Sequence, residues 1–144
     1  MLQIAFTIAQ KAFKDKTDKA GKPYFYHCER VENSICTQHP SINEEIKCIA
    51  LLHDLLEDCP EWNEKSLSCF FNQRVINGIV AMTHKKGQSY DDYISQVLEN
   101  SDARLVKKFD LLDNMDITRL PELSEKDLLR LKKYHTAYNR IVSF

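Results

Sequence analysis

Apolar residues recur at intervals of three and four positions along almost the whole chain, which is the spacing of one face of a helix. This pattern predicts helices over about 2–15, 23–38, 42–58, 65–71, 73–84, 89–99, 102–119 and 124–141. No segment shows the strict alternation of a half-buried strand. Ser41 to Glu45 and Ser124 to Asp127 have the composition of capped helix starts. We therefore predict an all-α fold, with residues 1–144 forming a single compact helical bundle.

Length and charge narrow the classes of partner. A chain of 144 residues fits one domain with a real core. Lys and Arg number 20 against 21 acidic residues, a formal charge of -1, so the overall balance does not indicate binding to nucleic acid or to a membrane surface. No segment approaches the roughly 18 apolar residues of a membrane span, and the first residues lack a secretion-signal pattern. We expect a cytoplasmic protein of unknown oligomeric state.

The five cysteines are odd in number and show no Cys-x-x-Cys spacing. Neither a disulfide framework nor a zinc knuckle is indicated, so we expect reduced thiols that mostly pack in the core. Cys28 and Cys59 adjoin the candidate site described next, but no pattern that activates a thiol surrounds them.

The segment from Ile49 to Asp58 combines an apolar run with four ionisable residues. Four apolar residues lead into His53-Asp54, and Glu57-Asp58 follows one turn later. On one continuous helix, Glu57 would lie over His53 and Asp58 over Asp54. Buried ionisable groups are costly unless they are paired or bind a metal. The segment therefore predicts a divalent cation.

Two further segments supply ligand-type residues from other predicted helices. His27 follows Pro23-Tyr24-Phe25-Tyr26, and Asp110 lies among apolar residues with Asn114 one turn below it. Together with His53 and Asp54 they make a set of two histidines and two aspartates. Such donors suit an octahedral Mn²⁺, Fe²⁺ or Co²⁺, with Zn²⁺ as an alternative, and leave positions open for water and substrate. A buried salt-bridge network without metal is the competing interpretation.

Three motifs in this order resemble those of the HD superfamily of metal-dependent phosphohydrolases. They are Gly21-Lys22-Pro23-Tyr24-Phe25-Tyr26-His27, Leu51-Leu52-His53-Asp54-Leu55-Leu56-Glu57-Asp58 and Lys107-Lys108-Phe109-Asp110-Leu111-Leu112-Asp113-Asn114. Within the superfamily they are similar to the hydrolase domain of the RelA/SpoT proteins and their small single-domain relatives, from about residue 5 to residue 140. Those proteins hydrolyse guanosine 3′,5′-bis(diphosphate), (p)ppGpp, at its 3′-pyrophosphate. The resemblance implies an HD-domain bundle with that activity and that small-molecule nucleotide substrate.

Site roles follow from the resemblance position by position. It implies that His27, His53, Asp54 and Asp110 hold Mn²⁺. Glu57 and Asp58 would orient or deprotonate the attacking water, and Asn114 would lie near the sugar of the substrate. A carboxylate one helical turn from an ion is well placed to accept a proton from water.

A polyanionic nucleotide also needs cations that the net charge does not supply. The candidates are lysines in the first loop, after Thr83-His84 and before Asp110, namely Lys16, Lys19, Lys22, Lys85, Lys86 and Lys107. As a group they are candidate phosphate contacts, although each lysine alone is better explained as a solvated surface charge. Tyr24, Tyr90 and Tyr93 are candidates for stacking on a base, with core packing as the alternative.

The chain departs from the (p)ppGpp hydrolases at several positions. It has Asp18 where they usually carry an arginine, Phe13 in place of a histidine, Cys28 in place of a proline and Phe109 in place of an alanine. None of these positions is a predicted metal ligand. Two other functions therefore stay open: an HD phosphatase for another phosphorylated metabolite (a nucleotide, a nicotinamide dinucleotide phosphate or a sugar phosphate), and a module that binds a nucleotide without turnover.

Overall fold

The computed structural model describes all residues, 1–144, and contains nine α-helices, one short 3₁₀-helix and no strand. The elements are α1 (Leu2–Ala12), α2 (Phe25–Gln38), α3 (Glu44–Leu52), α4 (Leu55–Asp58), α5 (Glu64–Leu67), α6 (Gln73–Ala81), α7 (Tyr90–Leu98), α8 (Ser101–Met115), η1 (Ile117–Arg119) and α9 (Glu125–Val142). The predicted all-α fold is confirmed. None of the helices has the length and apolarity needed to cross a membrane.

Helix α3 lies at the centre of the fold because it is apolar on nearly every side. Six of its nine residues are buried, and it packs against α1, α2, α6 and α8. Helix α6 approaches it so closely that a methyl group at Gly78 would overlap the side chain of Ile49. The residues that follow α3 are therefore held at a fixed depth inside the protein.

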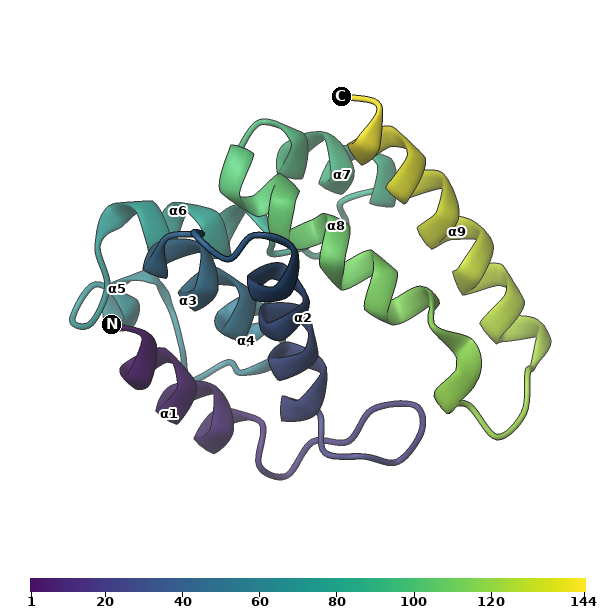
Figure 1. Cartoon of the computed structure of the whole chain (residues 1–144), viewed down its shortest axis with the longest axis horizontal. Helices are drawn as coiled ribbons and strands as arrows, with labels where there is room; N and C mark the ends of the chain where they lie inside the picture. The colour runs from purple at the N-terminus through teal and green to yellow at the C-terminus, as the bar shows by residue number, and fades with distance from the viewer.

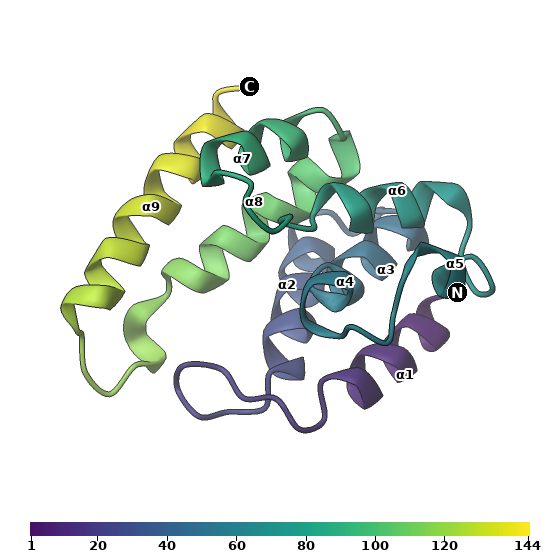
Figure 2. The same cartoon turned by 180° about the vertical axis from the view of Figure 1, so that it is seen from behind.

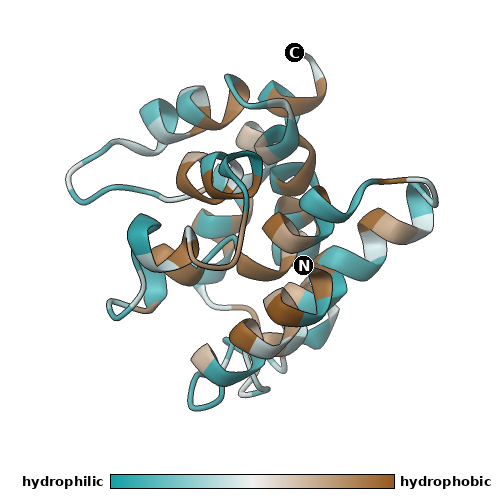
Figure 3. Ribbon diagram, turned by 90° about the vertical axis from the view of Figure 1, so that its left-hand side faces the viewer, coloured by the Kyte–Doolittle hydropathy of each residue, from teal (hydrophilic) through white to brown (hydrophobic).

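Helices α8 and α9 lie side by side on one flank of the molecule, away from α1 (Figures 1 and 2). Helix α9 buries only Ala137 and Ile141, whereas Leu129 is 69% exposed. Figure 3 shows apolar and polar residues together on most helices, and loops that are mostly polar. Helix α9 thus forms an outer wall rather than part of the core.

Side-chain caps fix where most of these helices begin. The side chains of Asn43, Asn63, Asn72, Ser89, Asn100 and Ser124 each accept a hydrogen bond from a backbone N–H in the first turn. Both predicted capped starts, before α3 and before α9, are confirmed. All five cysteines are free thiols, and three of them are buried.

The prediction of one helix over 42–58 is wrong, because the chain breaks at His53 and Asp54 into α3 and α4. Nδ1 of His53 lies 2.7 Å from the Ala50 carbonyl oxygen. A continuous helix would give that oxygen to the Asp54 N–H instead. The stacking of Glu57 over His53 and of Asp58 over Asp54 is therefore not the basis of the site.

Three other predicted helices are also longer than the observed ones. Helix α1 ends at Ala12 rather than near 15, and α2 begins at Phe25 because Pro23 pairs with Thr17 in an isolated bridge. The segment predicted as 102–119 is α8 followed by a separate 3₁₀ turn. The long loop 13–24 left between α1 and α2 reaches toward the end of α8 (Figure 1).

Candidate metal centre and adjoining cavity

Four predicted ligands meet where α2, the break between α3 and α4, and α8 come together. Nε2 of His27 lies 3.3 Å from Nε2 of His53 and 3.1 Å from an oxygen of Asp110. An oxygen of Asp54 lies 3.0 Å from Nε2 of His53 and 3.8 Å from Nε2 of His27. His53 and Asp54, at the break between α3 and α4, thus direct their side chains to one point.

The outer atoms of the two imidazoles determine which way their lone pairs point. Nδ1 of His27 lies 2.7 Å from a carboxylate oxygen of Asp113, and Nδ1 of His53 faces the Ala50 carbonyl at the same distance. Both oxygens only accept hydrogen bonds, so each Nδ1 carries the hydrogen and the Nε2 of a neutral ring offers a lone pair. Metal-ligating histidines are usually held in this way.

The ligand atoms of His27, His53 and Asp110 all lie within 4.8 Å of one another and fit one divalent ion, while Asp54 approaches the two imidazoles from the side. Donor atoms at about 2.1 Å from an ion lie roughly 3.0 Å apart at right angles and roughly 3.4 Å apart in a tetrahedron. The observed separations of 3.0 to 3.8 Å fall in or near that range. Nitrogen and oxygen donors without thiolate suit Mn²⁺, Fe²⁺ or Co²⁺, and Zn²⁺ as well.

The pKa shifts of the buried histidines and aspartates show that the centre favours positive charge. His53 is 1% exposed; burial would lower its pKa, but the carboxylates of Asp54 and Asp110 raise that pKa well above its ordinary value. Burial would raise the pKa of Asp110, but Lys107 and the two imidazoles hold it well below its ordinary value. The raised histidine pKa values and the lowered Asp110 pKa both mean that the centre favours positive charge, which a divalent cation would supply.

A second set of donors, Cys28 with His53 and Asp54, also lies within 4.8 Å of one another. Burial and nearby carboxylates raise the pKa of the Cys28 thiol well above its ordinary value. Because only the thiolate is a good ligand, the set of His27, His53 and Asp110 is the better metal site.

Other side chains fix the two ligand carboxylates. Nζ of Lys107 lies 2.7 Å from one oxygen of Asp110, and the side-chain amide of Asn114 donates to the other at 2.8 Å. The Tyr24 hydroxyl donates to Asp54 at 2.6 Å. Of these three residues, Lys107 and Asn114 were predicted to bind substrate, and both line the adjoining cavity.

The two candidate catalytic carboxylates lie in different positions. Glu57 lines the cavity, and one of its oxygens accepts a hydrogen bond of 2.7 Å from the backbone N–H of His84. Burial raises the pKa of Glu57, although that hydrogen bond opposes the shift. Burial also raises the pKa of Asp58, which is not among the cavity-lining residues.

The cavity has a volume of about 430 Å³ and opens beside the metal centre. The structure brings the predicted contacts Lys19, Lys107, Tyr90 and Asn114 to its wall. It does not bring Lys85 there, because that side chain is exposed on the turn that follows His84. The Lys85 backbone N–H donates to the side chain of Gln88, which fixes the turn.

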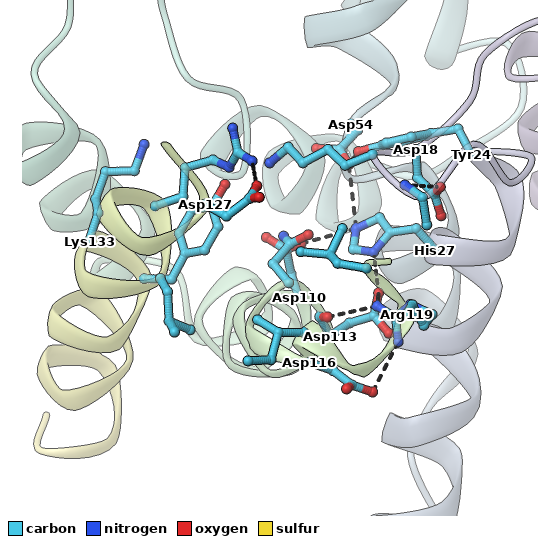
Figure 4. A pocket seen from close by; sticks show the side chains of 18 of the residues that line it. Asp18, Tyr24, His27, Asp54, Asp110, Asp113, Asp116, Arg119, Asp127 and Lys133 are labelled. Atoms are coloured by element: carbon cyan, nitrogen blue, oxygen red, sulfur yellow. Dashed lines mark hydrogen bonds and ion pairs between the residues drawn. The ribbon is translucent and has the colours of Figure 1, made fainter. Parts of the chain in front are cut away.

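Sequence reasoning missed several charged residues of the cavity wall. Asp113 contacts Nδ1 of His27 and is itself contacted by Arg30 and Arg119. Asp127, Arg130 and Lys133 line the cavity from α9, and Figure 4 shows Asp127 and Lys133 across the cavity from His27. A helical wheel of α2 could have found Arg30, which lies three residues after His27. No local pattern places α9 opposite the metal centre, since that depends on tertiary packing.

Comparisons with known proteins support the fold. No protein-family model and no curated protein sequence matches this chain. A solved structure described as a metazoan orthologue of SpoT that hydrolyses ppGpp and plays a role in starvation responses matches it with a TM-score of 0.81 and 19% identity. The match covers 97% of this chain and 84% of that one. The chain therefore has the all-α fold of a ppGpp hydrolase.

Proposed function

We propose that this protein is a metal-dependent phosphohydrolase of the HD type that uses Mn²⁺. The observation that carries the proposal is the convergence of His27, His53, Asp54 and Asp110 at the edge of a cavity large enough for a small ligand. A closed structural site would use all of its donors on the ion and adjoin no cavity. An accessible centre is what hydrolysis needs.

His27, His53 and Asp110, with Asp54 beside them, would hold a divalent ion that supplies a bound water of lowered pKa and a positive charge for a phosphoryl oxygen. The protein's own residues do the rest. Glu57 lines the cavity, and burial raises its pKa, which makes it a stronger proton acceptor than an ordinary carboxylate. The His84 N–H fixes one of its oxygens and leaves the other free to take that proton.

The far wall of the cavity is cationic. Lys19 from the first loop and Arg130 and Lys133 from α9 line it, and Asp127 on the same wall is ion-paired with Arg130, so the wall keeps a net positive charge. Nζ of Lys133 lies 4.6 Å from the ring centre of Tyr90, so the cation and the aromatic face are presented together. This combination favours a substrate that carries anionic groups at two ends and a planar base between them.

We propose (p)ppGpp as the substrate, hydrolysed at the 3′-pyrophosphate. Its two pyrophosphates match a metal centre facing a cationic wall, and the solved structure with the same fold belongs to a ppGpp hydrolase. Asp18 replaces the arginine usual in those hydrolases. Here it accepts the backbone N–H groups of Ala20 and Lys22 and so shapes the loop, while the guanidinium groups of the cavity come from α2, η1 and α9.

Turnover of a metabolite panel tests the proposal. The protein is prepared metal-free, supplied with Mn²⁺ and assayed with ppGpp, NADPH and nucleoside monophosphates. Pyrophosphate released from ppGpp supports the proposal, whereas orthophosphate released from a monoester supports a phosphatase for another metabolite. Saturable ppGpp binding without turnover supports a sensing module. His53→Ala removes a ligand and Glu57→Ala removes the candidate base, so both variants should lose activity.

A further inference from the structure

The Asp113 carboxylate, beside the metal centre, contacts three charged or ionisable side chains. One oxygen accepts Nδ1–H of His27 at 2.7 Å. Arg30 donates a hydrogen bond to each carboxylate oxygen, from Nε at 2.8 Å and from Nη2 at 3.0 Å. Arg119 lies 3.3 Å from the carboxylate and also donates to the Asp113 backbone carbonyl at 2.9 Å.

We propose that Asp113 is a positioning residue for His27, and that Arg30 holds Asp113 in place for this role. The inference rests on the metal centre of the proposed function and adds a residue to it. The Asp113 carboxylate keeps the hydrogen of His27 on Nδ1 and so directs the Nε2 lone pair at the ion.

The geometry restricts both partners. A planar guanidinium that binds two carboxylate oxygens leaves Asp113 no freedom to rotate. His27 and Arg30 both project from α2, three residues apart, and both contact Asp113 on α8. These contacts hold α8 against α2 one turn from Asp110. Figure 4 shows Asp113 and Arg119 below the His27 ring, whereas Asp127 and Lys133 lie to its left, beyond Asp110. Outer contacts of this kind typically contribute 10- to 100-fold to metal affinity.

The chain contains a matched control on the same helix. Asp102, in the first turn of α8, accepts an equivalent fork from Arg74, with distances of 2.7 and 3.0 Å. It contacts no histidine and does not line the cavity. Asp102→Asn therefore breaks an Arg–Asp fork of the same shape without affecting a ligand.

The experiment compares Asp113→Asn with Asp102→Asn by two measurements. Calorimetric titration of Mn²⁺ into metal-free protein gives the affinity, and long-range proton–nitrogen NMR at alkaline pH gives the tautomer of the His27 ring. We expect Asp113→Asn to bind Mn²⁺ about 10- to 100-fold more weakly, and to show His27 with hydrogen on Nε2 in part of the molecules. Asp102→Asn should keep both the wild-type affinity and the wild-type tautomer.

Unchanged affinity and tautomer in a folded Asp113→Asn protein would overturn the inference. If that variant does not fold, Arg30→Lys replaces it, because Lys keeps the charge but cannot form the fork; it should weaken Mn²⁺ binding by a smaller factor, and wild-type affinity would overturn the role of Arg30. The tautomer is measured without metal or substrate. A wild-type protein that binds no Mn²⁺ or hydrolyses no ppGpp would refute the proposed function, while the tautomer still decides the role of Asp113.

Discussion

Lys107 was predicted to contact substrate, but its position assigns it a larger part in stability. Its side chain is 9% exposed, that of Asp110 is 5% exposed, and 2.7 Å separates Nζ from the carboxylate. Lys107→Met keeps the aliphatic stem and removes only the charge. Asp110 then keeps only the imidazoles of His27 and His53 as charged neighbours, at 3.1 and 3.5 Å.

The expected loss follows from that burial. Removing one partner of a buried ion pair costs about 3–5 kcal/mol, because the other charge is left without compensation. We therefore expect the free energy of unfolding of the metal-free Lys107→Met protein to fall by about that amount. With saturating Mn²⁺ the loss should shrink, since the ion neutralises the same carboxylate.

Urea unfolding followed by circular dichroism measures this quantity well in an all-α protein. Arg74→Met is the control, because its pair with Asp102 is equally short but the Arg74 side chain is 48% exposed. An exposed pair contributes about 0–1 kcal/mol. If Lys107→Met loses no more stability than Arg74→Met at an unchanged urea slope, the assumed coupling between Lys107 and Asp110 is wrong.

Three further predictions concern the metal, the pH dependence and the base. Mn²⁺ at about 100 times its dissociation constant should stabilise the protein by about 2.7 kcal/mol, or roughly 6–10 °C in melting temperature for a domain of this size; His53→Ala should abolish the shift in a thermal melt. The pKa values of His27 and His53 are raised in the folded protein, so the stability they contribute is fully present below about pH 6.5 and is lost as the pH rises through the raised values. Urea titrations of the metal-free protein should show this alkaline loss, and saturating Mn²⁺ should remove most of it; a stability that rises with pH above neutral would contradict the assignment. Glu57→Gln should lower the turnover number for ppGpp by about 10²- to 10⁴-fold while calorimetry shows unchanged Mn²⁺ affinity; a parallel loss of affinity would instead make Glu57 part of the metal site.

Much of the fold could be predicted because its signals are local. Helical periodicity identified the long helices, and the side chains that cap α3 and α9 lie within three residues of the N–H groups they accept. The short elements were less predictable. Helix α4 has four residues, too few to show a period, and η1 follows α8 after one residue. The boundary at Phe25 depends on a bridge between Thr17 and Pro23 that no helical pattern contains.

The ligands could be predicted although the reason given for their grouping was partly wrong. Residue type and an apolar setting singled out His53, Asp54 and Asp110, since buried charges need partners wherever the backbone places them. A straight helix from 42 to 58 would put His53 and Asp54 on adjacent sides of one cylinder, about 100° apart. The turn at these two residues instead lets both approach His27, with the Ala50 carbonyl holding the His53 ring. The contact between the His53 ring and the Ala50 carbonyl lies where α3 ends. The same contact therefore accompanies the break that the helix prediction missed and orients a ligand of the centre.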